Sequence, residues 1–391
     1  MDFGITPENR DLVEKARIYA KEILYERAEK YDQEGRFPRE NFEDLSKVGF
    51  TSLTLPKKYG GRDLYSDPST YATVLYELSK ACTNTAMLFH MHSSITHVIT
   101  LLGTEKQSEL YSKEVNKGKI FASWASENTS SLHGQMVMDT KAKLNEDHYL
   151  VNGKKYFCSM AGEADYYVLW CQLENEEDLS KSIVLLIAPS NTKGFIIEDN
   201  WDTSAMRGTM SHSMEYKNVK IPLKNLIGTP GDAIRPDVLP KFGFGYSAVY
   251  LGTGGGAFEW VTDYAKKRKL KPDNVPIANF PNIQIRIGEM KVQLESALLM
   301  VQRAGWLIGT KGAENAYGAI NEAKHIAAKT AAMITENAMQ IAGAPSLLRD
   351  FPLERYHREA RAGLVMPPNV EKALELSAKT FVEGSAGSLM T

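Results

Sequence analysis

The string FHMHSSITH places three histidines, His90, His92 and His97, close together in the chain. If this string is helical, His90 and His97 are seven residues apart and share a face, whereas His92 points elsewhere. A metal site on a helix needs two histidines four residues apart together with a carboxylate, and this string lacks that pattern. The spacing therefore predicts no metal site, and it leaves two roles open for each imidazole: contact with a bound ligand, or packing.

A second string, FASWASENTSS, mixes an aromatic residue, small residues, hydroxyl groups and one carboxylate, that of Glu127. It lies where a helical pattern gives way to strands. The three cysteines, Cys82, Cys158 and Cys171, are odd in number and show no CxxC spacing. They indicate neither a disulfide framework nor a zinc site, and we expect buried free thiols.

Hydrophobic periodicity divides the chain into three parts. Apolar residues recur three and four apart up to about residue 118, which predicts a helical domain over residues 1–118. Residues 119–230 show the pattern of short strands, including a hairpin predicted at Asn152-Gly153, and form a central β-domain. Helical periodicity returns in residues 231–391, in three long segments beginning near Phe242, Asn282 and Asn315. The predicted fold class is α+β, with the β-domain between helices and a C-terminal four-helix bundle.

Composition limits the partners. The 391 residues exceed one ordinary core, and 43% hydrophobic with 24% charged residues is typical of a soluble globular protein. A net charge of −2 provides no basic surface for nucleic acid. The N-terminus lacks the features of a secretory signal and no apolar run is long enough to cross a membrane, so we expect a cytoplasmic protein without a membrane partner.

The sequence resembles the acyl-CoA dehydrogenase superfamily of flavoenzymes over essentially its whole length. Four strings in family order carry the resemblance: Trp124 to Glu127, Asn152 to Ser159, Met206 to Thr209, and Gln340 to Ala344 followed by RYHREAR from Arg355 to Arg361. The resemblance implies a flavin between the β-domain and the C-terminal bundle, where a polar and an apolar edge of the ring both need lining. The residues that it implies along the ring are Trp124, Ala125, Ser126, Phe157, Cys158 and Ser159.

The resemblance also implies a second part of the cofactor site. Arg268, Gln340 and Gly343 match positions that hold the adenosine and pyrophosphate end of the cofactor, partly across a subunit interface. Leu270-Lys271-Pro272 departs from the expected string after Arg268. The match at Arg268, Gln340 and Gly343 favours FAD, and the departure after Arg268 keeps FMN as the alternative. The resemblance also implies self-association as a homodimer or homotetramer.

The expected catalytic base is missing from this pattern. A flavin dehydrogenase acting next to a thioester needs a carboxylate to remove a proton. In the superfamily a glutamate usually follows the RYxRxA run, and an ungapped alignment puts Pro367 there. An alternative glutamate lies early in the first helix of the last domain, where this chain has Gly245-Tyr246. Glu127 matches a glutamate that in the family is not the base, so we expect it to be structural or to position the flavin.

Another branch, the dibenzothiophene-type flavin monooxygenases, resembles the chain at Asn128, at Asn152 to Ala161 and at Trp201. Such enzymes react a reduced flavin with oxygen and need hydrogen-bond donors rather than a strong base. The candidates for catalysis are Asn128, Ser159 and His92. The branch also has histidines after the RYHREAR run, where this chain has Gly363 and Met366.

Three hypotheses remain. The favoured one is a monooxygenase-like flavin oxidoreductase acting on a small apolar substrate. The alternatives are an acyl-CoA dehydrogenase with a relocated base and a flavin-binding relative without turnover.

Overall fold

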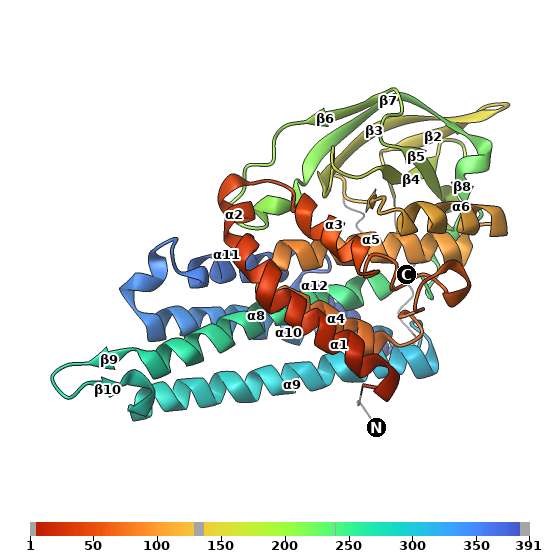
Figure 1. The fold of residues 1–391 in the computed structure, drawn as a ribbon. Helices are drawn as coiled ribbons and strands as arrows, with labels where there is room; N and C mark the ends of the chain where they lie inside the picture. Colours follow the sequence, from red (N-terminus) through yellow and green to blue (C-terminus); the bar gives the residue numbers. More distant parts are fainter. Residues whose placement is uncertain (1–4, 129–136, 239, 384–391) are drawn as a thin grey trace.

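The computed structural model describes residues 5–128, 137–238 and 240–383. A helical N-terminal part comes first, a sheet follows, and long helices complete the chain (Figure 1). This order confirms the predicted α+β fold class. The domain limits at residues 118 and 230 stay predictions.

The N-terminal part is built from helices, of which the long helix α5 is buried along most of its length. The helices are α1 (Pro7–Tyr19), α2 (Tyr25–Glu34), α3 (Arg39–Lys47), α4 (Pro68–Ala81), α5 (Thr83–Leu102) and α6 (Glu105–Asn116), with a π-helical turn at Ala20–Leu24. The extended backbone of Cys82 separates α4 from α5. The apolar pattern runs through this break because both helices bury their faces in the same core.

The central part is a sheet of eight strands, in the order β6-β7-β3-β2-β4-β5-β8 with β1 paired to β4. The strands are β1 (Phe121–Trp124), β2 (Lys141–Leu144), β3 (His148–Cys158), β4 (Tyr166–Leu173), β5 (Ile183–Pro189), β6 (Phe195–Glu198), β7 (His212–Pro222) and β8 (Leu226–Ile227), with a short helix α7 (Leu179–Ser182) before β5. Among the described residues, only β1 with β4 and β2 with β4 run parallel. The short strands that the sequence predicts for this region are therefore present in its described residues.

The hairpin predicted at Asn152-Gly153 is wrong. These two residues lie inside β3, where the register with β7 shifts between Val151 and Gly153. A Cβ on Gly153 would lie 2.5 Å from the Cα of Thr140, so a close backbone approach, not a turn, requires glycine here. The same dipeptide can mark either a hairpin turn or a β-bulge, because both structures use a glycine with positive φ.

The C-terminal part contains α8 (Pro240–Lys267), α9 (Pro281–Lys311) and α10 (Tyr317–Ala342), followed by α11 (Pro352–Val365) and α12 (Val370–Val382). A small hairpin, β9 (Lys269–Leu270) with β10 (Val275–Pro276), joins α8 to α9 at the end of the molecule away from the sheet (Figure 1). The glycine-rich run of α8 lies against α4: a Cβ on Gly256 would meet the carbonyl oxygen of Lys80 at 2.2 Å. The glycines of this run therefore let α8 and α4 approach closely. No helix in the described ranges has both the length and the apolarity needed to cross a membrane.

Candidate functional site

Glu127 is held inside the β-domain by a buried ion pair. Its carboxylate accepts from the ammonium of Lys155 at 2.6 Å and from the backbone N–H of Thr140 at 3.0 Å. The two side chains are only 4% and 0% exposed. Burial acts to raise the pKa of Glu127, but the Lys155 ammonium and the donors outweigh it and hold the pKa below its usual value. This carboxylate is fixed by strand contacts, as a structural role requires.

The strand that precedes Glu127 is tied to the end of β3. The indole nitrogen of Trp124 donates to the carbonyl oxygen of Ser159 at 2.7 Å, and the N–H of Tyr156 donates to the carbonyl oxygen of Ser126. The indole ring of Trp124 is buried against Tyr167. The structure thus brings the two sequence strings side by side, with Ser126 exposed and the Trp124 side chain in the core.

Two segments of unusual backbone face each other beside these strands. Four non-glycine residues have left-handed φ angles between 46° and 65°: Phe157, Met160, Met206 and Met210. The N–H of Met160 donates to the carbonyl oxygen of Thr209, in the 3₁₀ turn Arg207–Thr209. Such conformations are costly outside glycine and gather at binding sites, where surrounding structure holds them. The Phe157 side chain is 66% exposed and meets Trp201 edge-on, so an aromatic face is open to a ligand here.

Ser159 begins a chain of hydroxyl groups that sequence reasoning did not find. Its Oγ lies 2.8 Å from that of Ser211, which lies 2.7 Å from Oγ1 of Thr209, and Thr209 donates to the carbonyl oxygen of Met206. A carbonyl oxygen only accepts, so Ser211 donates to Thr209 and Ser159 donates to Ser211. Ser159 therefore presents an acceptor to a ligand, and Asn128 is exposed at the end of the first described range.

Cys158 and the other two cysteines are buried free thiols, as predicted. Burial in the sheet raises the pKa of Cys158 far above its ordinary value. A flavin could meet Cys158 only through its backbone.

His92 joins the N-terminal helices to β1. Its Nδ1 accepts from the N–H of Phe121 at 3.1 Å, and its Nε2 lies 3.1 Å from the carbonyl oxygen of Thr51. Burial lowers its pKa to about 4. Both ring nitrogens are used by the backbone, so His92 positions the first strand of the site.

His90 and His97 share the opposite face of α5, as the spacing predicts. His97 stacks on Tyr65 with ring centroids 4.1 Å apart, and burial lowers its pKa to about 3. His90 points at α8, where a Cβ on Gly245 would lie 2.1 Å from Cε1 of the imidazole. The ring of His90 thus occupies the space of a side chain at position 245.

The position aligned with the other family glutamate is Pro367, in the turn between α11 and α12. The last turn of α11, which precedes this segment, is held by Lys324, whose buried ammonium donates to the carbonyl oxygen of Gly363 at 2.8 Å. Burial lowers the pKa of Lys324 to about 8. Neither Gly245 nor Pro367 brings a carboxylate to this part of the molecule.

Arg268 lines a pocket of ≈ 410 Å³ at the far end of the bundle, beside the β9–β10 hairpin. Aromatic side chains of Tyr264 and Phe280 line it too, with Ile341 and Ala342. These last two residues lie between the predicted positions Gln340 and Gly343. Gln340 and Gly343 themselves are not among the residues that line the pocket. The β9–β10 hairpin beside it lies at the end of the molecule away from the sheet (Figure 1).

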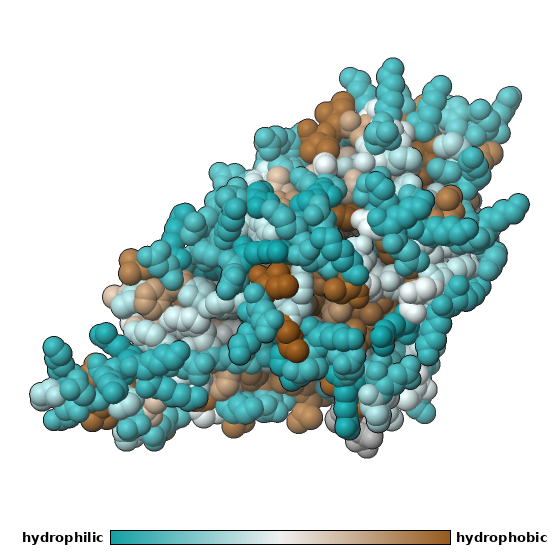
Figure 2. Space-filling model, viewed as in Figure 1, coloured by the Kyte–Doolittle hydropathy of each residue, from teal (hydrophilic) through white to brown (hydrophobic). Residues whose placement is uncertain are grey.

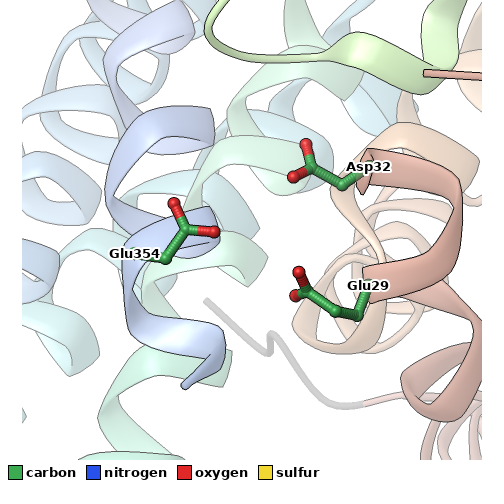
Figure 3. A group of neighbouring side chains, drawn as sticks. All are labelled: Glu29, Asp32 and Glu354. Carbon is green, nitrogen blue, oxygen red and sulfur yellow. The ribbon is translucent and has the colours of Figure 1, made fainter. Parts of the chain in front are cut away.

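Three carboxylates gather where α2 meets α11: Glu29, Asp32 and Glu354 (Figure 3). The cation among them is a guanidinium, because Arg358 contacts Asp32 and Glu354 at 2.6 Å each. Arg358 belongs to the RYHREAR run. This cluster therefore joins two domains through arginine, which is a structural role for the run.

Comparison with known proteins follows the same three-part division. Models of the acyl-CoA dehydrogenase N-terminal, middle and C-terminal domains match residues 6–119, 122–219 and 244–366. The protein YdbM of Bacillus subtilis (strain 168), which bears the name of an acyl-CoA dehydrogenase, is 30% identical over 387 residues, 96% of this chain and 97% of that protein. The chain belongs to the acyl-CoA dehydrogenase family. The resemblance found in the sequence and the class of flavin-dependent oxidoreductase are confirmed at this level.

Two solved structures show how widely this family fold is used. Butyryl-CoA dehydrogenase from Megasphaera elsdenii superposes with a TM-score of 0.90 at 24% identity, covering 98% of this chain and 100% of that one. A complex of TdsC from Paenibacillus sp. A11-2 with FMN and indole has a TM-score of 0.85 at 20% identity, covering 96% and 98%. The fold is therefore common to both, and the reaction must be argued from the residues of the site.

Proposed function

We propose that the protein holds a flavin against the β-domain and uses it, in reduced form, to insert oxygen into a small apolar substrate. The residues fit such a group: Phe157 offers an open aromatic side chain, Ser159 an acceptor and Asn128 an amide, around a backbone held in costly conformations. These suit the apolar face and the polar edge of an isoalloxazine ring. When bound, the flavin would supply the electrons that activate oxygen.

The observation that carries this proposal is the type of residue at positions 245 and 367, the two positions that the resemblance assigns to a catalytic glutamate. Pro367 has no acid group, and the space of residue 245 is filled by the imidazole of His90. Glu359 is a fully buried carboxylate of α11, and it accepts hydrogen bonds from Asn84 and Arg355. Oxygen insertion by a reduced flavin requires no carboxylate to take a proton from the substrate, which agrees with the residue types at these two positions.

The reaction is tested by loading the protein with flavin, reducing it, and mixing it with oxygen in the presence and absence of indole or a related aromatic compound. Without substrate, the reduced flavin should reduce the oxygen to hydrogen peroxide. With an accepted substrate, the peroxide yield should fall and a product heavier by one oxygen atom should appear, with the second oxygen atom leaving as water. Undiminished peroxide with every compound of a broad aromatic panel would reject the oxygenase proposal.

We further propose that the cofactor is FAD and that its adenosine end lies in the Arg268 pocket of a second subunit. The pocket offers the guanidinium of Arg268 beside Tyr264 and Phe280. The β9–β10 hairpin next to it lies at the end of the molecule away from the sheet (Figure 1). These groups suit a pyrophosphate and an adenine ring. FMN lacks that end, so it remains the alternative if the pocket has another use.

Arg268→Ala should weaken FAD binding about tenfold or more and leave FMN binding unchanged, because one charge-assisted hydrogen bond to phosphate is lost. Fluorescence titration of the apoprotein with each flavin measures this. Lys267→Ala, which removes a neighbouring charge outside the pocket lining, is the matched control. Equal losses for FAD and FMN would place the effect elsewhere in the fold.

Self-association is proposed on the apolar face of α9. Ile285, Val292 and Leu299 repeat every seven residues and are all exposed. Apolar side chains are visible along the lower edge of the molecule, where α9 lies (Figure 2). A stripe of this spacing packs against another helix, which supports a homodimer or homotetramer.

An acyl-CoA dehydrogenase remains the second candidate because YdbM, at 30% identity, bears that name. Such a reaction needs a base that none of the site residues described above supplies. A flavin-binding protein without turnover is the third possibility, and it predicts flavin binding with neither reaction.

A further inference from the structure

A cavity of ≈ 180 Å³ lies where α4, α8 and α9 pack against one another, among the helices below the sheet in Figure 1. Each of its lining residues belongs to one of these three helices, whereas the residues proposed for the flavin ring lie in and beside the strands. Most of the cavity wall is apolar, and is formed by the side chains of Ala72, Ala248, Leu251, Leu298 and Val301.

The cavity exists because small residues line it while close contacts fix the helices around it. A Cβ on Gly305 of α9 would lie 3.0 Å from the Cα of Ser69 in α4, so these two helices approach closely one turn away from the cavity. At the cavity itself, the side chains of Ala72 and Ala248 are too short to fill the space between the helices. An apolar cavity of about 150 Å³ takes up benzene, so this one has room for a single aromatic ring.

Gln302 lines the cavity, and its Oε1 is buried without a hydrogen-bond partner among the described residues. Its Nε2 donates to Oγ1 of Thr73 at 2.8 Å and lies 3.5 Å from the carbonyl oxygen of Ser69. Thr73 donates its own hydrogen to that carbonyl oxygen, so its Oγ1 must accept from Gln302. These contacts decide which end of the amide is the nitrogen, and they leave Oε1 as an acceptor in need of a donor.

Glu77 brings a carboxylate to the cavity wall, but its charge is already balanced. It contacts Arg17 at 3.2 Å and Lys80 at 2.9 Å. A cationic ligand would therefore compete with two existing partners. An anionic ligand would meet two acceptors, this carboxylate and the oxygen of Gln302, and would lose its hydration without gaining a donor. The wall favours a neutral ligand that carries a donor.

We propose that this cavity binds a small neutral phenol, whose ring fills the apolar part and whose hydroxyl donates to Oε1 of Gln302. The volume sets the size of the ligand, the apolar wall requires the ring, and the unpaired oxygen requires the hydroxyl. The ring of Tyr76, which also lines the cavity, offers an aromatic contact. The site does not depend on the reaction proposed above, because that reaction uses none of these residues.

The hydrogen bond is tested with two ligands and two proteins, each protein loaded with flavin. Phenol and toluene are close in size, but only phenol carries a donor, and calorimetric titration measures the dissociation constant of each. Gln302→Leu keeps a side chain of similar volume and removes the acceptor. It should weaken phenol binding relative to toluene binding by about tenfold, because one buried hydrogen bond is lost. Gln293→Leu, at an exposed position of the same helix, should leave the ratio of the two constants unchanged.

The cavity itself is tested with Ala248→Leu, whose larger side chain takes the place of the ligand's ring. This change should remove one bound molecule of phenol, and one of toluene, per chain. If Ala248→Leu does not fold, the comparison with Gln302→Leu decides, because that variant adds no volume to the core.

Three results would overturn the proposal. Phenol that binds Ala248→Leu and Gln302→Leu as tightly as it binds the wild type occupies some other site. An equal loss of phenol and toluene affinity in Gln302→Leu would show that no hydrogen bond to the amide oxygen is made. Binding of neither compound to the wild type at millimolar concentrations would leave the cavity to water.

Discussion

Replacing Glu127 by alanine is expected to cost the protein about 3–5 kcal/mol of unfolding free energy, since it leaves the ammonium of Lys155 buried without a charge partner. Lys155 is 0% exposed, so solvent does not reach its ammonium in the folded protein to take the place of the carboxylate. The change also removes the acceptor of the Thr140 N–H, where the chain enters β2. Urea unfolding, with the midpoint and slope both measured, gives the loss.

A neighbouring pair on the same strand supplies the control. Lys154 contacts Glu198 at 2.5 Å, but these side chains are 36% and 37% exposed. Glu198→Ala should therefore cost less than about 1 kcal/mol. The double variant Glu127→Gln/Lys155→Met should recover much of the loss, because it removes the buried charge. A Glu127→Ala protein of unchanged stability that binds flavin but has lost its reaction would instead make Glu127 a catalytic residue.

Acidification is expected to destabilise the protein steeply as the pH falls from 6.5 towards 4. His90 and His92 have pKa values of about 4 and His97 of about 3, all lowered by burial from 6.5. Between those limits the unfolded chain binds protons that the folded chain excludes, so stability decreases as the pH falls. Each histidine contributes up to about 1.4 kcal/mol per pH unit in this window.

His97→Phe isolates one of these contributions. Neither ring nitrogen of His97 has a hydrogen-bond partner of ordinary geometry among the described residues, so phenylalanine can keep the stacking on Tyr65 without breaking a hydrogen bond. The unfolding free energy of the variant should fall less steeply, by about 1.4 kcal/mol per pH unit, between pH 6.5 and 4. A pH dependence identical to that of the wild type would mean that His97 is already protonated in the folded protein.

Periodicity was enough to predict the three-part architecture, because each element buries a whole face and leaves a regular signal. Examples are the strands between residues 166 and 222 and the long helices that begin near residues 242, 282 and 315. Local turn chemistry was less informative. Asn152-Gly153 has the composition of a hairpin turn, yet contact with Thr140 makes it a bulge within β3.

Short sequence segments were enough to indicate candidate residues of the site. Contacts between residues on separate helices could not be predicted. Trp124 and Ser126 lie beside the end of β3, where Ser159 follows, and their contact with a flavin stays a prediction. The chain of hydroxyls beyond Ser159 needs the turn at Arg207–Thr209 to fold back, which no spacing reveals. The contact of His90 with Gly245 joins residues on separate helices, and a glycine in α8 gives no hint of which side chain fills its space.

The central claim is that this family member works without a carboxylate base, and one measurement addresses it most directly. Wild-type protein loaded with oxidised flavin is mixed, in the absence of oxygen, with saturated acyl-CoA thioesters of short, medium and long chain, and the flavin absorbance is followed. We predict that the absorbance stays unchanged with every thioester. Rapid bleaching by any one of them would show that a base is present, and would contradict the account given for Gly245, Pro367 and His90.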